Sequence, residues 1–198
     1  MPDRDVNLQL ILDLSAGVMR ERASPRCAAA AERVFSRLGE RTGPTGAGTG
    51  AHLPFCRHAL DGAYSAMAAC PSPLPELAAA FAAVESGLSW ARRSSSTPAN
   101  QPFHDGHANA MLIGPGGLEQ RDDVWVGATV MAPGILYPDH SHPPEEVYLA
   151  FTEGEWWNAE MDWTRPGPGG LIYNPPGILH AMRSGPAPFL ALWFLPIG

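Results

Sequence analysis

The sequence predicts a mainly β protein in which an α-helical N-terminal part precedes a C-terminal barrel or double-sheet jelly roll. From Ala108 onward, short apolar segments of strand length alternate with clusters of Gly and Pro, as is typical of barrels and jelly rolls. Before that point, apolar residues such as Leu8, Ile11 and Leu12 recur at helical spacing. We therefore expect a helical region with a linker over residues 1–106 and a barrel over residues 107–198.

Four helices are expected in the N-terminal part. The first starts near Leu8, and the second starts at Pro25 and stops at Gly39. The third spans 55–69, and the fourth runs from Pro73 to about Arg92. A linker rich in Ser and Pro is expected over 94–106. Because the helices carry apolar stripes but no catalytic group, we expect them to cover the mouth of the barrel and shield it from water.

Seven strand-like segments are expected in the C-terminal part. They are 111–113, 124–131, 147–151, 155–161, 170–173, 179–183 and 189–194. Glu153-Gly154 is expected to form the turn of a hairpin between the third and fourth of these segments.

Composition excludes several classes of function. The net charge is −7, which argues against a nucleic acid as partner. The three cysteines (Cys27, Cys56 and Cys70) are too few and too irregularly spaced for a disulfide framework or a zinc knuckle. No stretch has the ~18 apolar residues of a membrane helix, and the N-terminus lacks a signal-peptide pattern. We expect a cytoplasmic protein without a membrane partner; monomer and homodimer both remain open.

Metal-ligating residues are concentrated in two stretches of the C-terminal part. The first contains His140, His142 and Glu146, and the second ends in His180. Side chains alternate faces along a strand, so His140 and His142 are expected to share a face. Imidazoles and a carboxylate form a mixed N/O ligand set. This set suits one divalent ion of Fe, Zn, Mn, Ni or Co and does not select among these metals.

These two stretches resemble the two conserved motifs of the cupin superfamily. The first motif is matched by Gly134, His140, His142, Glu146 and Gly154, and the second by Gly169, Pro175, Gly177 and His180. One extra residue before Gly154, and Ser184 where Asn is usual, fall outside the ligand positions. The resemblance implies a metal-binding cupin β-barrel, also called a double-stranded β-helix, over 107–198.

Two tyrosines accompany the expected ligands. Tyr148 follows Glu146 on the same strand face, and Tyr137 precedes His140. A free phenol has a pKa of about 10 and is a poor base at neutral pH. A divalent cation close by would favour the phenolate, which could then remove a proton next to a carboxylate.

The run 137–148 is similar to the motif of bacterial cupin lyases that cleave dimethylsulfoniopropionate (DMSP), with the Q-type enzymes most alike. This resemblance implies cleavage of a zwitterionic small molecule to dimethyl sulfide and acrylate. It implies that His142, Glu146 and His180 hold the metal, with His140 as a fourth ligand. It also implies that Tyr148 is the base and that Tyr137 assists it, both contacting the substrate.

The sulfonium group of such a substrate is a soft cation that should prefer aromatic faces. The barrel offers six large aromatic residues besides the two tyrosines, and one or two of them are expected to line the pocket: Trp125, Trp156, Trp157, Trp163, Tyr173 and Trp193.

Two other functions fit the same ligands. One is a cupin-type iron dioxygenase acting on a small thiol or acid, which would need oxygen. The other is a non-enzymatic, metal-dependent small-molecule sensor, although the helical part lacks a basic recognition helix. Two interpretations remain for His104 and His107. They are either an accessory ligand pair or substrate contact, or structural histidines of a loop, and we favour the structural role.

Overall fold

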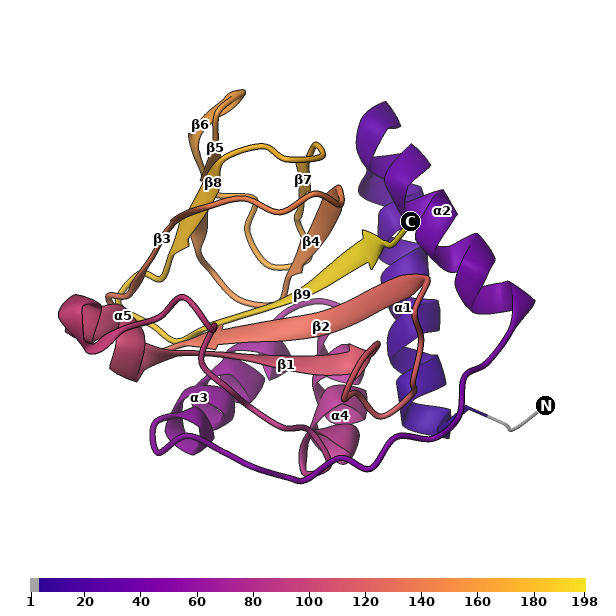
Figure 1. The fold of residues 1–198 in the computed structure, drawn as a ribbon, viewed down its shortest axis with the longest axis horizontal. Helices are drawn as coiled ribbons and strands as arrows, with labels where there is room; N and C mark the ends of the chain where they lie inside the picture. The colour runs from indigo at the N-terminus through magenta and orange to yellow at the C-terminus, as the bar shows by residue number, and fades with distance from the viewer. Residues whose placement is uncertain (1–3) are drawn as a thin grey trace.

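The structure is a computed structural model that describes residues 4–198. It contains two antiparallel sheets that face each other, with helices against one of them (Figure 1). The five-stranded sheet has the order β1 (His107–Ile113), β2 (Val124–Met131), β9 (Phe189–Pro196), β4 (Glu146–Ala150), β7 (Leu171–Asn174). The four-stranded sheet has the order β3 (Leu136–His140), β8 (His180–Arg183), β5 (Glu155–Asn158), β6 (Met161–Thr164). The predicted mainly β fold with a helical N-terminal part is confirmed.

Four helices pack on the outer face of the five-stranded sheet. They are α1 (Val6–Arg22), α2 (Pro25–Glu40), α3 (Cys56–Ala68) and α4 (Leu74–Glu85). Alternate strand residues such as Val126, Val130 and Leu192 join the apolar cluster of the helices. Their neighbours on the strands point into the barrel instead, because side chains alternate faces.

This arrangement corrects the expectation that the helices cover the barrel mouth. In Figure 1, α3 and α4 lie on the far side of β1 and β2 from the four-stranded sheet. Their apolar stripes match the apolar outer face of the sheet, which fixes them there. The helices and the barrel therefore share one hydrophobic core. The predicted division after residue 106 stays a prediction, and its residues 1–3 lie outside the described part of the chain. Within residues 4–198, no helix has the length and apolar character needed to cross a membrane.

The predicted end of the fourth helix and the predicted linker both need correction. The fourth helix ends at Glu85 rather than near Arg92, because a turn at Gly87 follows and Ala91 then pairs with Asn109 of β1. The predicted linker contains a short 3₁₀ helix (Pro98–Asn100) and α5 (Gln101–Gly106). Each begins with a proline in its first turn, a position where the missing N–H does no harm.

Three strand predictions also need correction. The first strand starts at His107, not at 111, and the predicted strand 155–161 is two strands, β5 and β6. Between these two, the amide of Glu160 donates to the Asn158 side chain (2.9 Å) and closes a turn. Glu153-Gly154 does not form a hairpin, because β4 and β5 belong to different sheets. Gly154 instead allows close packing, since a Cβ there would lie 2.4 Å from the Phe189 ring.

A buried ionic cluster ties the N-terminal helices to the barrel. The Arg4 guanidinium contacts the Glu119 carboxylate at 2.6 Å, and both side chains are almost fully buried. Arg121, also buried, donates to both carboxylate oxygens of Asp123 (2.8 Å each) and to the Arg37 carbonyl (2.9 Å). Burial raises the pKa of Glu119, but the hydrogen bonds from Arg4 and from the Gly43 amide outweigh it, so the pKa lies below its usual value.

Glu119 should therefore make stability depend on pH in acid. Because its pKa is depressed on folding, its contribution is complete above the unfolded pKa of about 4.3 and is lost as pH falls through the lower folded pKa. Glu119→Gln should destabilise the fold by about 3–5 kcal/mol at pH 7, since Arg4 and Arg121 lose a buried partner. It should also flatten the fall in the free energy of unfolding between pH 5 and pH 3, measured by urea titration.

The matched control is Glu21→Gln, which removes an exposed carboxylate from α1. It should leave both the stability at pH 7 and the acid dependence close to those of the wild type. An unchanged acid dependence in Glu119→Gln would show that other carboxylates dominate acid unfolding.

Candidate metal centre

Three side chains from separate parts of the barrel meet between the two sheets. Glu146 begins β4, His180 begins β8, and His142 lies in the turn between β3 and β4. One ligand atom of each lies within 4.8 Å of the others, a spacing that a metal ion could bridge. The Glu146 Oε2 atom is 3.3 Å from the His142 Nε2 atom and 3.4 Å from the His180 Nε2 atom.

The local backbone explains this convergence. The strand β3 ends at His140, so His142 reaches the cluster from the turn made by Pro143 and Pro144 and not by strand alternation. The amide of Gly177 donates to the His142 carbonyl (3.0 Å), which joins this turn to the one before His180. Gly177 has φ = 71°, a left-handed conformation that favours glycine.

The tautomers of the imidazoles suit metal binding. Each Nδ1 atom bonds a nearby backbone carbonyl: His142 to Pro144 (2.9 Å), His180 to Ile178 (3.0 Å). A carbonyl only accepts, so Nδ1 carries the proton and Nε2 presents its lone pair to the cluster. The His180 Nε2 atom is buried without a hydrogen-bond partner among the described residues. A divalent cation would bind both the unpaired His180 Nε2 atom and the Glu146 carboxylate. The residues of the cluster therefore suit a metal ion.

A second layer of polar groups holds the carboxylate. Asn174 donates to the Glu146 Oε2 atom (3.3 Å), and Asn158 donates to the Asn174 side chain (3.0 Å). Burial raises the pKa of Glu146, but the neighbouring imidazoles lower it more, so the carboxylate is ionised. Burial lowers the pKa of His142, yet the Glu146 carboxylate raises it overall.

His140 lies beside the three-residue cluster but is not part of it. It pairs with His180 across β3 and β8, and the two ring centroids are 4.0 Å apart. Its Nδ1 atom bonds the Pro138 carbonyl (2.9 Å), as in the other two histidines. Burial, followed by the charge of His180, lowers the pKa of His140 to about 3. Its role as fourth ligand stays a prediction.

The cluster borders a cavity of about 840 Å³ inside the barrel. Glu146, His142, His140 and both predicted catalytic tyrosines line it. Segments outside the strands, 91–93 and 115–116, complete its wall.

Tyr148 lies deep in this cavity, with 3% of its surface exposed. Burial, and then the nearby Glu146 carboxylate, raise the pKa of Tyr148 well above its usual value. The chain's own residues therefore keep this phenol protonated, and a cation beside it is needed to form a phenolate.

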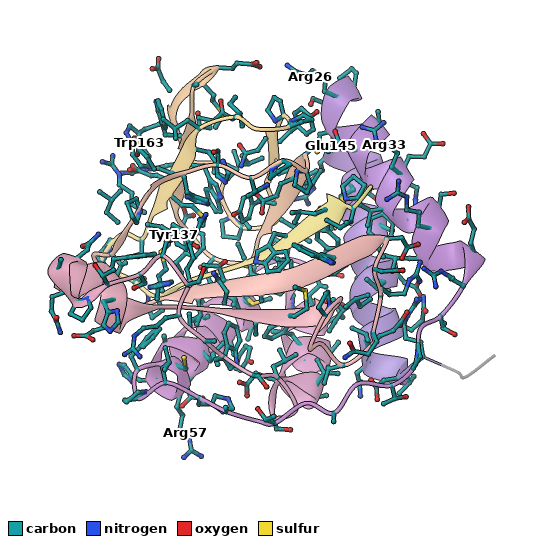
Figure 2. The ribbon with its side chains drawn as sticks, in the orientation of Figure 1. Arg26, Arg33, Arg57, Tyr137, Glu145 and Trp163 are labelled. Atoms are coloured by element: carbon teal, nitrogen blue, oxygen red, sulfur yellow. The ribbon has the colours of Figure 1, made fainter. Side chains whose placement is uncertain are left out.

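Tyr137, which is labelled in Figure 2, has other hydrogen-bond partners than Tyr148. The Asn109 amide donates to the Tyr137 hydroxyl oxygen (3.2 Å), and Thr129 in turn donates to the Asn109 side chain (2.7 Å). Burial raises the pKa of Tyr137, while the charge of Arg93 and the Asn109 hydrogen bond oppose this increase. Sequence reasoning missed Asn109 and Thr129. The sequence did offer one indication that these residues have a role, because both are polar residues in strands that are otherwise largely apolar.

Two of the six candidate aromatic residues line the cavity, namely Trp125 and Trp193. The Trp193 ring lies against Gly127, where a Cβ would be 2.1 Å from its Cζ2 atom, so glycine makes room for the indole. Trp156 is fully buried in the core. Trp163 is exposed on the four-stranded sheet, and Tyr173 donates to Glu145 (2.9 Å), which lies beside α2 (Figure 2).

The structure places His104 and His107 outside the cluster. The Nδ1 atom of buried His107 bonds the Phe103 carbonyl, and its Nε2 atom accepts the Arg93 amide at 3.0 Å. His104 bonds the Ser96 hydroxyl (3.0 Å). Both nitrogens of His107 are occupied, which agrees with a structural histidine rather than a ligand.

Known proteins are similar to this chain in sequence and in fold. A protein-family model described as dimethylsulfoniopropionate lyase matches residues 26–191. The dimethylsulfoniopropionate lyase DddQ of Ruegeria pomeroyi is 33% identical over 114 residues, which are 57% of this chain and 57% of the relative. The chain thus matches little more than half the length of this curated relative.

Two solved structures superpose on nearly the whole chain. The crystal structure of DMSP lyase DddQ from Ruegeria pomeroyi DSS-3 has a TM-score of 0.71 at 25% identity, covering 98% of this chain and 92% of that one. A structure reported for the DMSP lyases RdDddP and RnDddQII has a TM-score of 0.63 at 21% identity, covering 96% and 93%. The second similarity concerns the fold alone.

Proposed function

The chain belongs to the dimethylsulfoniopropionate lyase family, whose model matches residues 26–191, and we propose that it is a metal-dependent carbon–sulfur lyase. The proposed reaction cleaves dimethylsulfoniopropionate to dimethyl sulfide, acrylate and a proton. One observation carries the proposal: two of the three clustered ligands, His142 and Glu146, line the same cavity as two buried phenols, and its volume of about 840 Å³ suits a small molecule.

His142, Glu146 and His180 are proposed to hold one divalent transition metal ion, with His140 as the fourth ligand. The orphaned His180 Nε2 atom beside an ionised carboxylate supports this assignment. Iron, zinc, manganese, nickel and cobalt all suit such a ligand set. When bound, the ion supplies positive charge that stabilises negative charge developing next to the substrate carboxylate.

Tyr148 is proposed as the base that takes the α-proton of the substrate. Its phenolate oxygen forms the new O–H bond, and the electron pair of the C–H bond becomes the double bond of acrylate. The carbon–sulfur bond breaks, and its electron pair leaves with sulfur as neutral dimethyl sulfide. The position of Tyr148 on β4, on the same face as Glu146, supports this role because strand alternation aims both side chains into the cavity.

Tyr137 is proposed to bind the substrate and assist Tyr148. Its hydroxyl oxygen already accepts from Asn109, so its own proton is free to be donated toward the cavity. The faces of Trp125 and Trp193 are proposed to contact the sulfonium, each contact contributing roughly 0.5–2 kcal/mol.

The decisive experiment is headspace gas analysis of purified protein mixed with dimethylsulfoniopropionate. We expect dimethyl sulfide release when the protein is loaded with a divalent metal, and loss of release after chelation. Dimethyl sulfide release should continue without oxygen, whereas an iron dioxygenase would need oxygen. Repeated turnover would also distinguish an enzyme from a non-enzymatic sensor. No dimethyl sulfide with any of the five metals would overturn the proposal.

A further inference from the structure

The cavity contains a cation whose charge the described residues leave unbalanced. Arg93 lines the cavity, with its Cζ atom 5.9 Å from the centroid of the Tyr137 ring. It forms no ion pair within residues 4–198, whereas its neighbour Arg92 lies 3.6 Å from the Asp105 carboxylate. Glu146 is the one carboxylate side chain among the lining residues, and it faces the imidazoles of His142 and His180.

Hydrogen bonds hold the backbone of the segment that carries Arg93. Its amide donates to the His107 Nε2 atom (3.0 Å), and two residues earlier Ala91 exchanges two hydrogen bonds of 2.9 Å with Asn109. The amide of Trp90 donates to the Ala51 carbonyl (2.7 Å). This segment therefore pairs with β1 over a short stretch, and the backbone of Arg93 is held in place before any ligand binds. Pre-positioning lowers the entropic cost of binding.

A guanidinium that lines a cavity and has no anion beside it among the described residues calls for an anionic partner. Its planar, forked donors match the two oxygens of a carboxylate and can bind them together. The same charge repels a sulfonium. Trp125 and Trp193, whose aromatic rings suit a soft cation, also line the cavity.

We infer that Arg93 binds the carboxylate end of the ligand and thereby orients it, with the sulfonium directed away toward the aromatic faces. The identity of the ligand rests on the proposed function, but the anion site itself does not. Arg93 could not be identified from the sequence, because no motif near it in the chain indicates that it belongs to the site. Its role follows from the pairing of 91–93 with β1.

The test uses two probes that each carry one end of the zwitterion: propionate has the carboxylate alone, and trimethylsulfonium has the cation alone. Binding to the metal-loaded protein is measured by calorimetry. Arg93→Gln should weaken propionate binding about 10–100-fold, as loss of a charge-assisted hydrogen bond predicts. Trimethylsulfonium should bind equally well or more tightly, because a repelling charge is gone.

Two variants serve as controls. Arg93→Lys keeps the charge but not the fork, so it should lose less propionate affinity than Arg93→Gln and also covers the case in which the glutamine variant fails to fold. Arg57→Gln removes an exposed arginine of α3 that points away from the barrel (Figure 2), and its affinities should match those of the wild type.

Dimethyl sulfide release, measured in the same variants, separates the two hypotheses. Wild-type release with unchanged propionate affinity in both Arg93 variants would refute the anion site and leave the proposed function standing. Arg93-dependent propionate binding in a protein that releases no dimethyl sulfide would refute the function and leave the anion site standing.

Discussion

Tyr148→Phe is expected to lower the turnover of dimethylsulfoniopropionate by at least the roughly 10²–10⁴-fold typical of general-base catalysis. The change keeps the buried ring, which has 3% of its surface exposed, and removes only the hydroxyl that is proposed to take the proton. Two readouts test it: dimethyl sulfide release, and exchange of the substrate α-hydrogen with deuterated water. Both should fall together, because exchange requires the same proton transfer.

Two tyrosine variants calibrate this result. Tyr64→Phe removes another buried hydroxyl, one in α3 without a hydrogen-bond partner among the described residues, and should leave turnover unchanged. Tyr137→Phe should cost less than Tyr148→Phe if Tyr137 only positions or assists. Near-normal exchange in Tyr148→Phe would show that another group takes the proton, with Tyr137 the next candidate because of its proximity to Arg93 and Asn109.

The location of the candidate site could be predicted from sequence because its motif residues are close together in the chain. His140, His142 and Glu146 fall within one short stretch, and His180 follows a recognisable Pro-x-Gly pattern. The structure brings three of these four into one cluster. Their role as metal ligands stays a prediction, as does the role of the two tyrosines.

The residues that sequence reasoning missed owe their position to pairing between distant segments. Asn109 lies in β1, which pairs with β2, and its side chain reaches the Tyr137 hydroxyl from there. The two residues are 28 positions apart in the sequence. Gly127 makes room for Trp193, which is far along the chain but adjacent in β9. Strand order and register set such contacts, and neither follows from local periodicity.

The placement of the helices shows the same limit. Their apolar stripes were visible in the sequence, but the face of the sheet that would receive them was not. Residues of β2 such as Val126 and Val130 alternate with Trp125 and Thr129, so both faces of this strand are largely apolar or buried. The alternation alone therefore did not distinguish the helix-facing side from the cavity-facing side.

His180→Ala is expected to remove most of the bound metal from the purified protein. Its side chain is 1% exposed, and its Nε2 atom, which has no hydrogen-bond partner among the described residues, is proposed to be one of the ligands of the ion. Asn174→Ala removes the hydrogen bond to Glu146, together with the acceptor of Asn158, and should weaken metal affinity by the roughly 10–100-fold typical of an outer-shell partner. His180→Ala should exceed this loss. Elemental analysis and competition with a chromophoric chelator measure both.

His58→Ala is the matched control, because it removes an exposed imidazole of α3 and should retain the full metal content. His140→Ala separates two descriptions of the centre. If His140 is a fourth ligand, its loss should approach that of His180→Ala. If it only packs against the His180 ring, with centroids 4.0 Å apart, the loss should resemble that of Asn174→Ala. Full metal content in His180→Ala would mean that the His142–Glu146–His180 cluster is not the metal site, whatever the activity of the variant.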